Sequence, residues 1–246
     1  MHTVDFHTTV FRWVAICFAL GLVLMGVVGC QERRESKEVF ELFSDLQIGT
    51  IESPSAEQNA YIVHLDNSSD CLVVDAGYDA DQIIRSIKRH NLNPVAVLVT
   101  HGHHDHFVGN KDIKDKWPQC KIYVGKDDAA ELIDTQAADI TLSGGEQITV
   151  AGVPISVIHL PGHSRGHMLY RIEREEGIVI FVGDVIFEDS IGRSDFPGGS
   201  ASDLIYGIHE KIMTQPPDTI LYPGHGPKTT VKRESQHNPF LQMEHE

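Results

Sequence analysis

The stretch Thr100-His101-Gly102-His103-His104-Asp105-His106 directly follows Val95–Val99, an apolar run with the length of a buried strand. Residues that follow a strand lie on a loop that a rigid element holds in place. The first two histidines are two residues apart, and Asp105 and His106 are adjacent, so a tight loop can direct two pairs of side chains toward two neighbouring points. Gly102 permits backbone conformations that a side chain forbids. Because neutral imidazole and carboxylate bind Zn²⁺, Fe²⁺ and Mn²⁺, the stretch predicts a metal site.

Three further strand ends carry residues of the types that bind metals. They are His163 after Ile155–Leu160, Asp184 after Ile178–Val182, and His225 after Thr219–Tyr222. The alternative interpretation, a surface cluster of histidines, predicts no matching groups elsewhere in the chain. Four strand ends with suitable side chains therefore favour one shared metal site over scattered structural histidines.

The whole chain alternates short strand-like runs with helical ones. Further strands are predicted at Val39–Phe43, Ala60–Leu65, Cys71–Asp75, Lys121–Val124, Gln147–Val150 and Met168–Ile172. Helices are predicted at Asp79–His90, with Asp79 as the N-cap, near Asn110–Lys116 and Asp127–Ile133, and at Ser200–Met213 and Val231–Gln236. Mixed strands and helices throughout indicate the α/β (α+β) class, with two sheets covered by helices in one domain.

The N-terminal segment, residues 1–29, has the pattern of a signal peptide or a membrane anchor. A nearly unbroken apolar run spans Trp13 to Val28, which is about the length of a signal-peptide core and short for a membrane span. The Gly29-Cys30 pair at its end resembles a bacterial lipoprotein box, which implies cleavage before Cys30 and lipid on its thiol; an uncleaved anchor is the alternative. We therefore expect a membrane-anchored protein on the extracytoplasmic or periplasmic side, with residues 30–38 as a linker and 39–246 as the folded domain.

Composition and cysteine usage narrow the possible partners. The chain has 246 residues and a formal net charge of −15 at pH 7, which argues against nucleic acid because phosphate binding needs a basic face. With Cys17 in the signal segment and Cys30 assigned to lipid, Cys71 and Cys120 remain. Cys71 opens an apolar run and is predicted to be a core residue, with a Cys71–Cys120 disulfide as the alternative in an oxidising compartment.

The order H-x-H-x-D-H, P-G-H, G-D and P-G-H-G resembles the metallo-β-lactamase superfamily, from about Val39 to the C-terminus. The resemblance implies an αβ/βα four-layer sandwich of two mixed β-sheets flanked by helices, with two divalent metal ions in a cleft between the sheets. Zinc is the first expectation, with iron or manganese as alternatives. The resemblance also implies the ligands: His101, His103 and His163 for the first metal, Asp105, His106 and His225 for the second, and Asp184 as the bridge.

The chemistry expected of such a site is hydrolysis. Two metal ions that share one water lower its pKa toward neutrality, and the bridging hydroxide attacks a carbonyl carbon. We expect Asp105, besides acting as a ligand, to orient the nucleophile or accept its proton, so Asp105 and Asp184 are the predicted catalytic residues. His104 occupies the variable position of the motif and is expected to lie outside the ligand set, and His167 is expected to be structural.

Several segments resemble one branch of the superfamily. Gly183–Phe187, Gly192–Gly199 and Pro223–Thr230 are similar to the short bacterial glyoxalase-II-like hydrolases, which are thioesterases related to hydroxyacylglutathione hydrolase. Typical glyoxalase II continues into a helical C-terminal domain that helps to bind glutathione, whereas about 20 residues follow His225 here. The expected substrate is a small hydroxyacylglutathione-like thioester, with another thioester, an ester or a lactone as alternatives.

Two other reactions of the superfamily stay as alternatives. Asp184 lies where the common lactamase branches carry a metal-binding cysteine, which disfavours a β-lactamase. A variant of the stretch Gly192–Phe196 also occurs in persulfide dioxygenases, which use one iron. Arg193 and Asp195 within this stretch are predicted to form a structural ion pair beneath the cleft.

Overall fold

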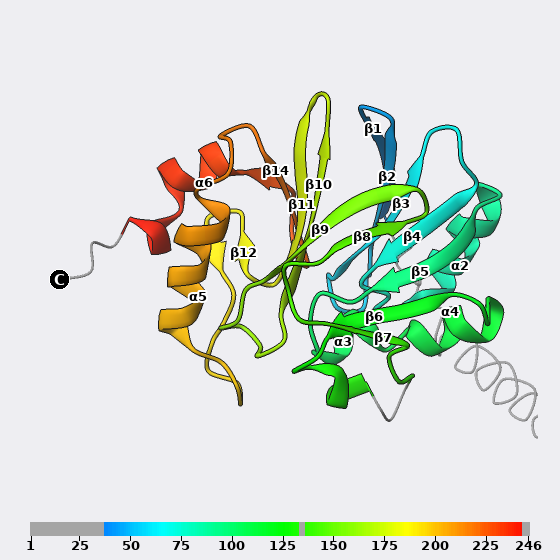
Figure 1. Ribbon diagram of the computed structural model, residues 1–246, viewed down its shortest axis with the longest axis horizontal. Coiled ribbons are helices and arrows are strands. Elements are labelled where there is room, and N and C mark those ends of the chain that lie inside the picture. The colour runs from blue at the N-terminus through cyan, green and yellow to red at the C-terminus, as the bar shows by residue number, and fades with distance from the viewer. Residues whose placement is uncertain (1–36, 133–135, 243–246) are drawn as a thin grey trace, which may run out of the picture. The chain divides into compact units, whose positions relative to one another are not determined.

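Two β-sheets pack face to face, and helices cover the outer face of each, in the residues that the computed structural model describes, 37–132 and 136–242 (Figure 1). This arrangement confirms the predicted four-layer αβ/βα sandwich. In this part of the chain no helix is long and apolar enough to cross a membrane. The signal segment, Cys30 and the linker as far as residue 36 lie outside the described residues, so the predictions about them stay predictions.

The first sheet contains seven strands in chain order. They are β1 (Lys37–Phe43), β2 (Leu46–Glu52), β3 (Asn59–Leu65), β4 (Asp70–Val74), β5 (Asn93–Leu98), β6 (Lys121–Gly125) and β7 (Ile140–Leu142). Strands β1 to β4 pair antiparallel, and β4 to β7 pair parallel. The helices α2 (Ala80–Arg89) and α4 (Asn110–Lys116) bury Ile83, Ile87 and Ile113 against its outer face.

The second sheet contains six strands in the order β15-β14-β11-β10-β9-β8. Their bounds are β8 (Gln147–Val150), β9 (Val153–His159), β10 (Met168–Arg174), β11 (Gly177–Gly183), β14 (Ile220–Pro223) and β15 (Thr229–Thr230). Because β11 and β14 pair in parallel, their carboxyl ends meet at one edge of the sheet. Its outer face packs on Leu204 of α5 (Ala201–Gly207), Ile208 of the π-helical turn η2 (Ile208–Ile212) and Val231 of α6 (Val231–His237).

Five short elements lie outside these layers or join them. They are the one-turn helix α3 (His104–Phe107), the 3₁₀ turns η1 (Ala129–Leu132) and η3 (Pro239–Leu241), and a two-stranded ribbon of β12 (Ile186–Phe187) and β13 (Ser190–Ile191). Helix α3 follows β5 and the ribbon follows β11, so both extend from strand ends that carry predicted ligands.

The core between the sheets includes three aromatic rings in contact with one another. Tyr61 of β3 lies 5.1 Å from Phe181 of β11 and 5.4 Å from Tyr222 of β14, measured between ring centroids. Contacts of this kind add about 0.5–1.5 kcal/mol to the free energy of burial. The Tyr61 hydroxyl also donates a hydrogen bond to the carbonyl of Pro223, at 2.5 Å. The core therefore fixes the end of β14, from which the loop with His225 begins.

The sequence-based prediction missed β2, β7 and the short strands β12, β13 and β15. In β2, Gly49 interrupts the strand signal, because glycine lowers strand propensity. In the structure the ring of Phe40 on the neighbouring strand β1 lies over Gly49, and a Cβ at this position would require that ring to move. Strand β1 begins at Lys37, so the last two residues of the predicted linker belong to the sheet.

Three helix predictions need correction. The segment predicted as a helix at Asp127–Ile133 forms only the turn η1 within the described residues, and the helix predicted at Ser200–Met213 divides into α5 and η2. Asp79 occupies the N-cap position of α2 but makes no capping hydrogen bond. Its carboxylate instead accepts a hydrogen bond of 2.5 Å from the Ser53 hydroxyl.

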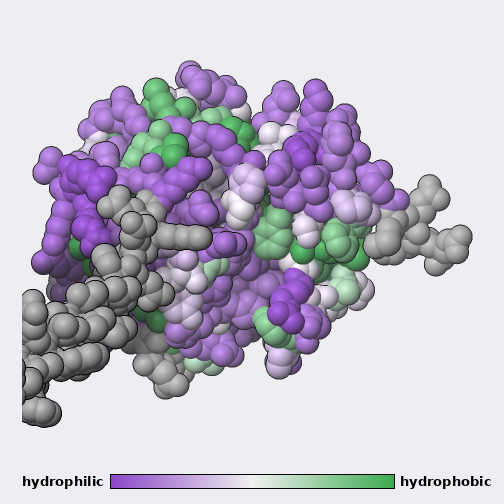
Figure 2. Space-filling model, turned by 180° about the vertical axis from the view of Figure 1, so that it is seen from behind, coloured by the Kyte–Doolittle hydropathy of each residue, from purple (hydrophilic) through white to green (hydrophobic). Residues whose placement is uncertain are grey.

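The face of the molecule seen in Figure 2 is mainly hydrophilic, with separate apolar areas between the polar ones. Among the described residues the most exposed large apolar side chains are Tyr206, at 67%, and Leu42, at 61%. Cys71 and Cys120 are both buried and are free thiols, which confirms Cys71 as a core residue. Scattered exposed apolar side chains are ordinary on a folded protein and indicate no particular partner.

Candidate metal centre

The seven predicted ligands converge at one edge of the two sheets. Each stands at or just after a strand end. His163 follows β9, Asp184 follows β11, His225 follows β14, and the other four follow β5: His101, His103, Asp105 and His106. Their donor atoms form three groups, each within 4.8 Å: His101, His103 and His163; Asp105, His106 and His225; and His101, His106 and Asp184. The first two groups are the two triads that the sequence predicted, and the third joins them through Asp184.

Asp184 lies between the two triads. Its Oδ1 is 3.5 Å from His106 Nε2, and its Oδ2 is 3.7 Å from His163 Nε2 and 3.6 Å from His225 Nε2. Its two carboxylate oxygens therefore face donors from both triads. Gly224 makes this approach possible, because a Cβ at that position would collide with Asp184 Oδ1.

The close approach of these donor atoms suits a bound divalent cation better than it suits hydrogen bonds among the side chains themselves. His101 Nε2 lies 3.0 Å from a ring nitrogen of His103 and 3.2 Å from His163 Nε2, so imidazole nitrogens of the three residues face one another. His106 Nε2 and Asp184 Oδ1 are buried and have no hydrogen-bond partner among the described residues. Buried polar atoms without partners cost free energy, which a cation bound between them would recover. This His/Asp cluster could thus bind metal ions.

Hydrogen bonds on the outer ring nitrogens aim three histidines inward. His163 Nδ1 donates to the carbonyl of Arg193 at 2.8 Å, His106 Nδ1 to Asp75 at 2.9 Å, and His225 Nδ1 to the carbonyl of Glu57 at 3.1 Å. When Nδ1 carries the proton, Nε2 presents its lone pair to the centre. The same pattern is found around ligand histidines in metal proteins.

The two triads differ in electrostatics. Burial lowers the pKa of His101, His103 and His163, so these rings are neutral and ready to coordinate at neutral pH. Burial alone would also lower the pKa of His106, but the carboxylates of Asp184 and Asp75 hold it well above its usual range. A divalent cation in the second group would take the place of that proton.

Asp75 and Thr100 form a buried support behind the second triad. Thr100 donates to Asp75 from its backbone N–H and from its hydroxyl, both at 2.7 Å, and His106 Nδ1 donates to the same carboxylate. Asp75 directly follows β4, as the predicted ligands follow other strands. This role is not evident from the sequence, where Asp75 is only the last residue of the predicted strand Cys71–Asp75.

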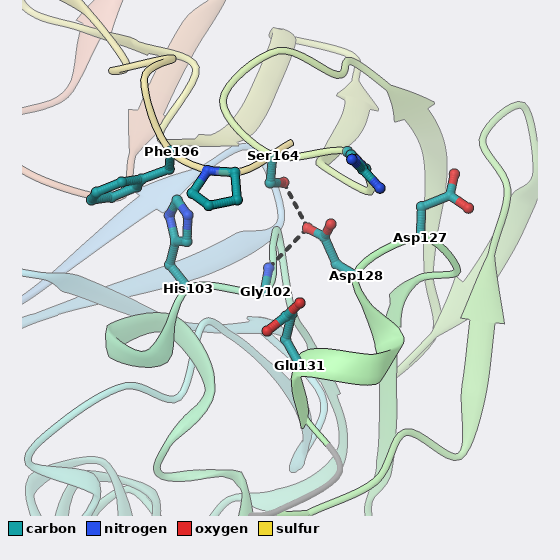
Figure 3. A pocket seen from close by; sticks show the side chains of 9 residues that line it. Gly102, His103, Asp127, Asp128, Glu131, Ser164 and Phe196 are labelled. Atoms are coloured by element: carbon teal, nitrogen blue, oxygen red, sulfur yellow. Dashed lines mark hydrogen bonds between the residues drawn. The ribbon is translucent and has the colours of Figure 1, made fainter. Parts of the chain in front are cut away.

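Asp128 joins the loop after β5 to the loop after β9 (Figure 3). Its carboxylate accepts hydrogen bonds from Gly102 N–H at 2.9 Å, from the Ser164 hydroxyl at 2.6 Å and from Gly166 N–H at 2.7 Å. Asp128 is 4% exposed. These bonds fix the distance between His103 and His163, and no local signal in the sequence indicated them.

The other residues singled out from the sequence lie around this centre. His104 is exposed and its Nδ1 pairs with the Tyr78 hydroxyl at 3.0 Å, so it lies outside the ligand groups as predicted. His167 is fully buried, stacks on His101 and accepts a hydrogen bond from Asp184 N–H at 3.2 Å, which agrees with a structural role. Arg193 and Asp195 do pair, at 2.7 Å, but the pair is exposed, so its predicted place beneath the cleft was wrong.

Comparison with known proteins agrees with the geometry. Residues 56–225 match the family described as "Metallo-beta-lactamase superfamily". A Bacillus subtilis relative named "Probable metallo-hydrolase YqgX" is 32% identical over 200 aligned residues, and the match covers 75% of this chain and 92% of the relative. "Hydroxyacylglutathione hydrolase GloC" of Haemophilus influenzae is 31% identical over 215 aligned residues, and that match covers 80% of this chain and 98% of the relative.

A solved structure agrees as well. The crystal structure of the BLEG-1 B3 metallo-β-lactamase superposes with a TM-score of 0.75 at 34% identity, and the match covers 80% of this chain and 100% of that one. The sequence relatives, the solved structure and the His/Asp cluster point the same way. This chain belongs to the metallo-β-lactamase superfamily of metal-dependent hydrolases.

Proposed function

We propose that this chain is a two-metal hydrolase that cleaves small thioesters of the hydroxyacylglutathione type. The observation that carries the proposal is the position of Asp184, whose two carboxylate oxygens face donors from both triads. A carboxylate in this position can bind two ions at once. The similarity to the relative named hydroxyacylglutathione hydrolase supports a thioester as the substrate.

The chain provides a proton acceptor beside the proposed metal sites. Bound divalent ions would supply a water of lowered pKa and a positive charge beside the carbonyl oxygen. The carboxylate of Asp105 is 29% exposed and its Oδ2 lies 3.2 Å from His225 Nε2, so this member of the second triad also faces the open side of the site. It can orient the attacking water and accept its proton. In the overall reaction the water oxygen bonds to the acyl carbon, the carbon–sulfur bond breaks, and the thiolate leaves with a proton as the free thiol.

Metal analysis combined with turnover tests this proposal. The purified full-length chain should hold two ions per chain by elemental analysis and should hydrolyse S-lactoylglutathione, which is followed by loss of thioester absorbance. A chelator should abolish turnover and added metal should restore it. The exposed variant Glu175→Gln should behave as the native chain does. A chain with two bound ions that leaves every thioester intact would contradict the proposal.

The solved B3 metallo-β-lactamase favours a second candidate, β-lactam hydrolysis, because its identity to this chain is 34%. A cephalosporin that changes colour on ring opening should be cleaved more slowly than S-lactoylglutathione if the first proposal holds. The persulfide dioxygenase alternative predicts one iron per chain and oxygen uptake with a glutathione persulfide. Faster β-lactam cleavage would favour the second candidate, and oxygen uptake would favour the dioxygenase.

A further inference from the structure

A cavity of about 390 Å³ adjoins the proposed metal centre at His103 (Figure 3). It is bounded by the start of the His-rich stretch, by turn η1 and the residues before it, by the loop after β9 and by the segment after β13. Its lining residues are Gly102, His103, Asp127, Asp128, Glu131, Ser164, Arg165, Phe196 and Pro197. Because His103 belongs to both the cavity and the first triad, a substrate held at the metals would extend one end into this space.

The lining of the cavity is acidic. It contains three carboxylates, from Asp127, Asp128 and Glu131, against the one guanidinium of Arg165. Asp128 is committed to the loop hydrogen bonds described above. Asp127 and Glu131 are exposed and form no ion pair within residues 37–132 and 136–242. Their charges are therefore free to act on a bound molecule.

Arg165, the one cation of the lining, offsets one of its three carboxylates, whereas Arg193 is already paired. Arg193 lies 2.7 Å from Asp195 and covers the ring of Phe196, with the guanidinium carbon 3.7 Å from the ring centroid. Phe196 in turn contacts His103 edge to face, with centroids 5.3 Å apart. This side of the cavity therefore presents an aromatic wall, while Glu131 stands beneath Gly102 on the other side (Figure 3).

The net charge of the whole chain also favours cationic ligands over anionic ones. A formal net charge of −15 gives the molecule a negative field that repels anions and attracts cations. The carboxylates of Asp127 and Glu131 add to that effect locally, because they lie in the lining of the cavity. A ligand such as glutathione, with carboxylates of its own, is a poor electrostatic match for this space.

We propose that the acidic cavity (Asp127, Glu131 and the aromatic wall of Phe196) receives the thiol end of the thioester and selects uncharged or cationic groups over anionic ones. The inference rests on the proposed thioesterase function and ranks its substrates: thioesters of the glutathione type are cleaved, and those of neutral or cationic thiols are cleaved faster. Under this proposal S-lactoylglutathione is a usable but weak substrate, and thioesters whose thiol carries an ammonium group or no charge are preferred.

Three acetyl thioesters that differ only in the charge of the thiol test the proposal. They are acetylthiocholine, a cation, S-acetyl-N-acetylcysteamine, which is neutral, and S-acetyl-3-mercaptopropionate, an anion. The native full-length chain should show kcat/KM for the cation at least about tenfold above that for the anion, mainly through KM, and the ratio should shrink as salt is added. A ratio that favours the anion would overturn the proposal.

Variants that remove charges show whether the preference for the cation comes from the cavity. In the double variant Asp127→Asn/Glu131→Gln the cation-to-anion ratio should fall to within about threefold of one. The matched control Glu175→Gln/Asp218→Asn removes two exposed charges near the starts of β11 and β14, the ends of these strands opposite Asp184 and His225, and should keep the native ratio. Equal changes in both double variants would assign the preference to net charge alone and overturn the role of the cavity.

A binding measurement separates this inference from the proposed function. The thioethers S-methylthiocholine and 3-(methylthio)propionate cannot be hydrolysed, and their dissociation constants from the native chain and both double variants can be measured by calorimetry. Tighter binding of the cation, lost in Asp127→Asn/Glu131→Gln, supports the acidic cavity even if no thioester is cleaved. Equal or tighter binding of the anion overturns the cavity proposal even if thioesters are cleaved.

Discussion

Replacement of Asp75 by asparagine tests whether a buried carboxylate sets the tautomer of His106. Asp75 is 1% exposed and accepts two hydrogen bonds from Thr100 and one from His106 Nδ1. Asparagine has nearly the same shape but offers one oxygen and one NH₂ group. If its oxygen keeps the bond from Thr100 N–H, its NH₂ group faces His106, whose Nδ1 must then accept. The proton of His106 moves to Nε2, the atom that faces the proposed second metal.

The expected magnitude follows from the loss of one oriented ligand. Removing a partner behind a metal-binding histidine weakens metal affinity by about 10–100-fold, or about 1.4–2.7 kcal/mol. Competition with a chromophoric zinc chelator should show one weakened site in Asp75→Asn, and nitrogen-15 spectra of the histidine rings should show the changed tautomer. Asp139→Asn, which removes a carboxylate that accepts hydrogen bonds from Lys114 and from Ile122 N–H of β6, should bind metal as the native chain does. A folded Asp75→Asn protein with two native affinities would refute the reasoning.

Four other perturbations follow from the same structure. Asp184→Ala should lose at least one ion per chain and most hydrolysis, because the bridge contacts both triads; full metal content with normal turnover would show that Asp184 is no bridge. Asp128→Ala leaves three buried donors without an acceptor and should lower the free energy of unfolding by about 2–3 kcal/mol, measured with urea, with faster hydrogen exchange at Gly102 and Gly166; unchanged exchange would count against the link between the loops. Burial holds the pKa of His167 well below its usual range, so the unfolded state gains a proton as pH falls below about 6.5 while the folded state does not. Metal-free His167→Gln should therefore gain stability relative to the native chain as pH falls from 7 to 5, by up to about 1.4 kcal/mol per pH unit. If urea unfolding gives the same difference in free energy between variant and native chain at both pH values, this prediction is wrong. Removal of residues 1–29 should leave a soluble protein with native metal content and turnover, and poor metal binding by the shortened chain would contradict the predicted domain start.

Much of the site could be predicted from the sequence because its ligands share one local signature. Each follows a short apolar run, and a strand and the residue after it are both visible within a few positions of the chain. The family motif then assigned the ligands to two triads and a bridge, and the structure brings these seven side chains together. The helix α4 and the strand β8 were also predicted with their observed bounds, since periodicity and turn residues marked both ends.

The tertiary structure alone decided what surrounds those ligands. Asp75 meets His106 across 31 residues and Asp128 meets Ser164 across 36, and no periodicity in the sequence connects such partners. The same holds for the acidic cavity, whose walls combine two metal-binding loops with turn η1 and the segment after β13, and for Gly49, over which the ring of Phe40 lies. Local spacing determines which residues stand at strand ends. Packing of the two sheets determines which of those ends meet, which hydrogen bonds orient them and which charges a substrate encounters.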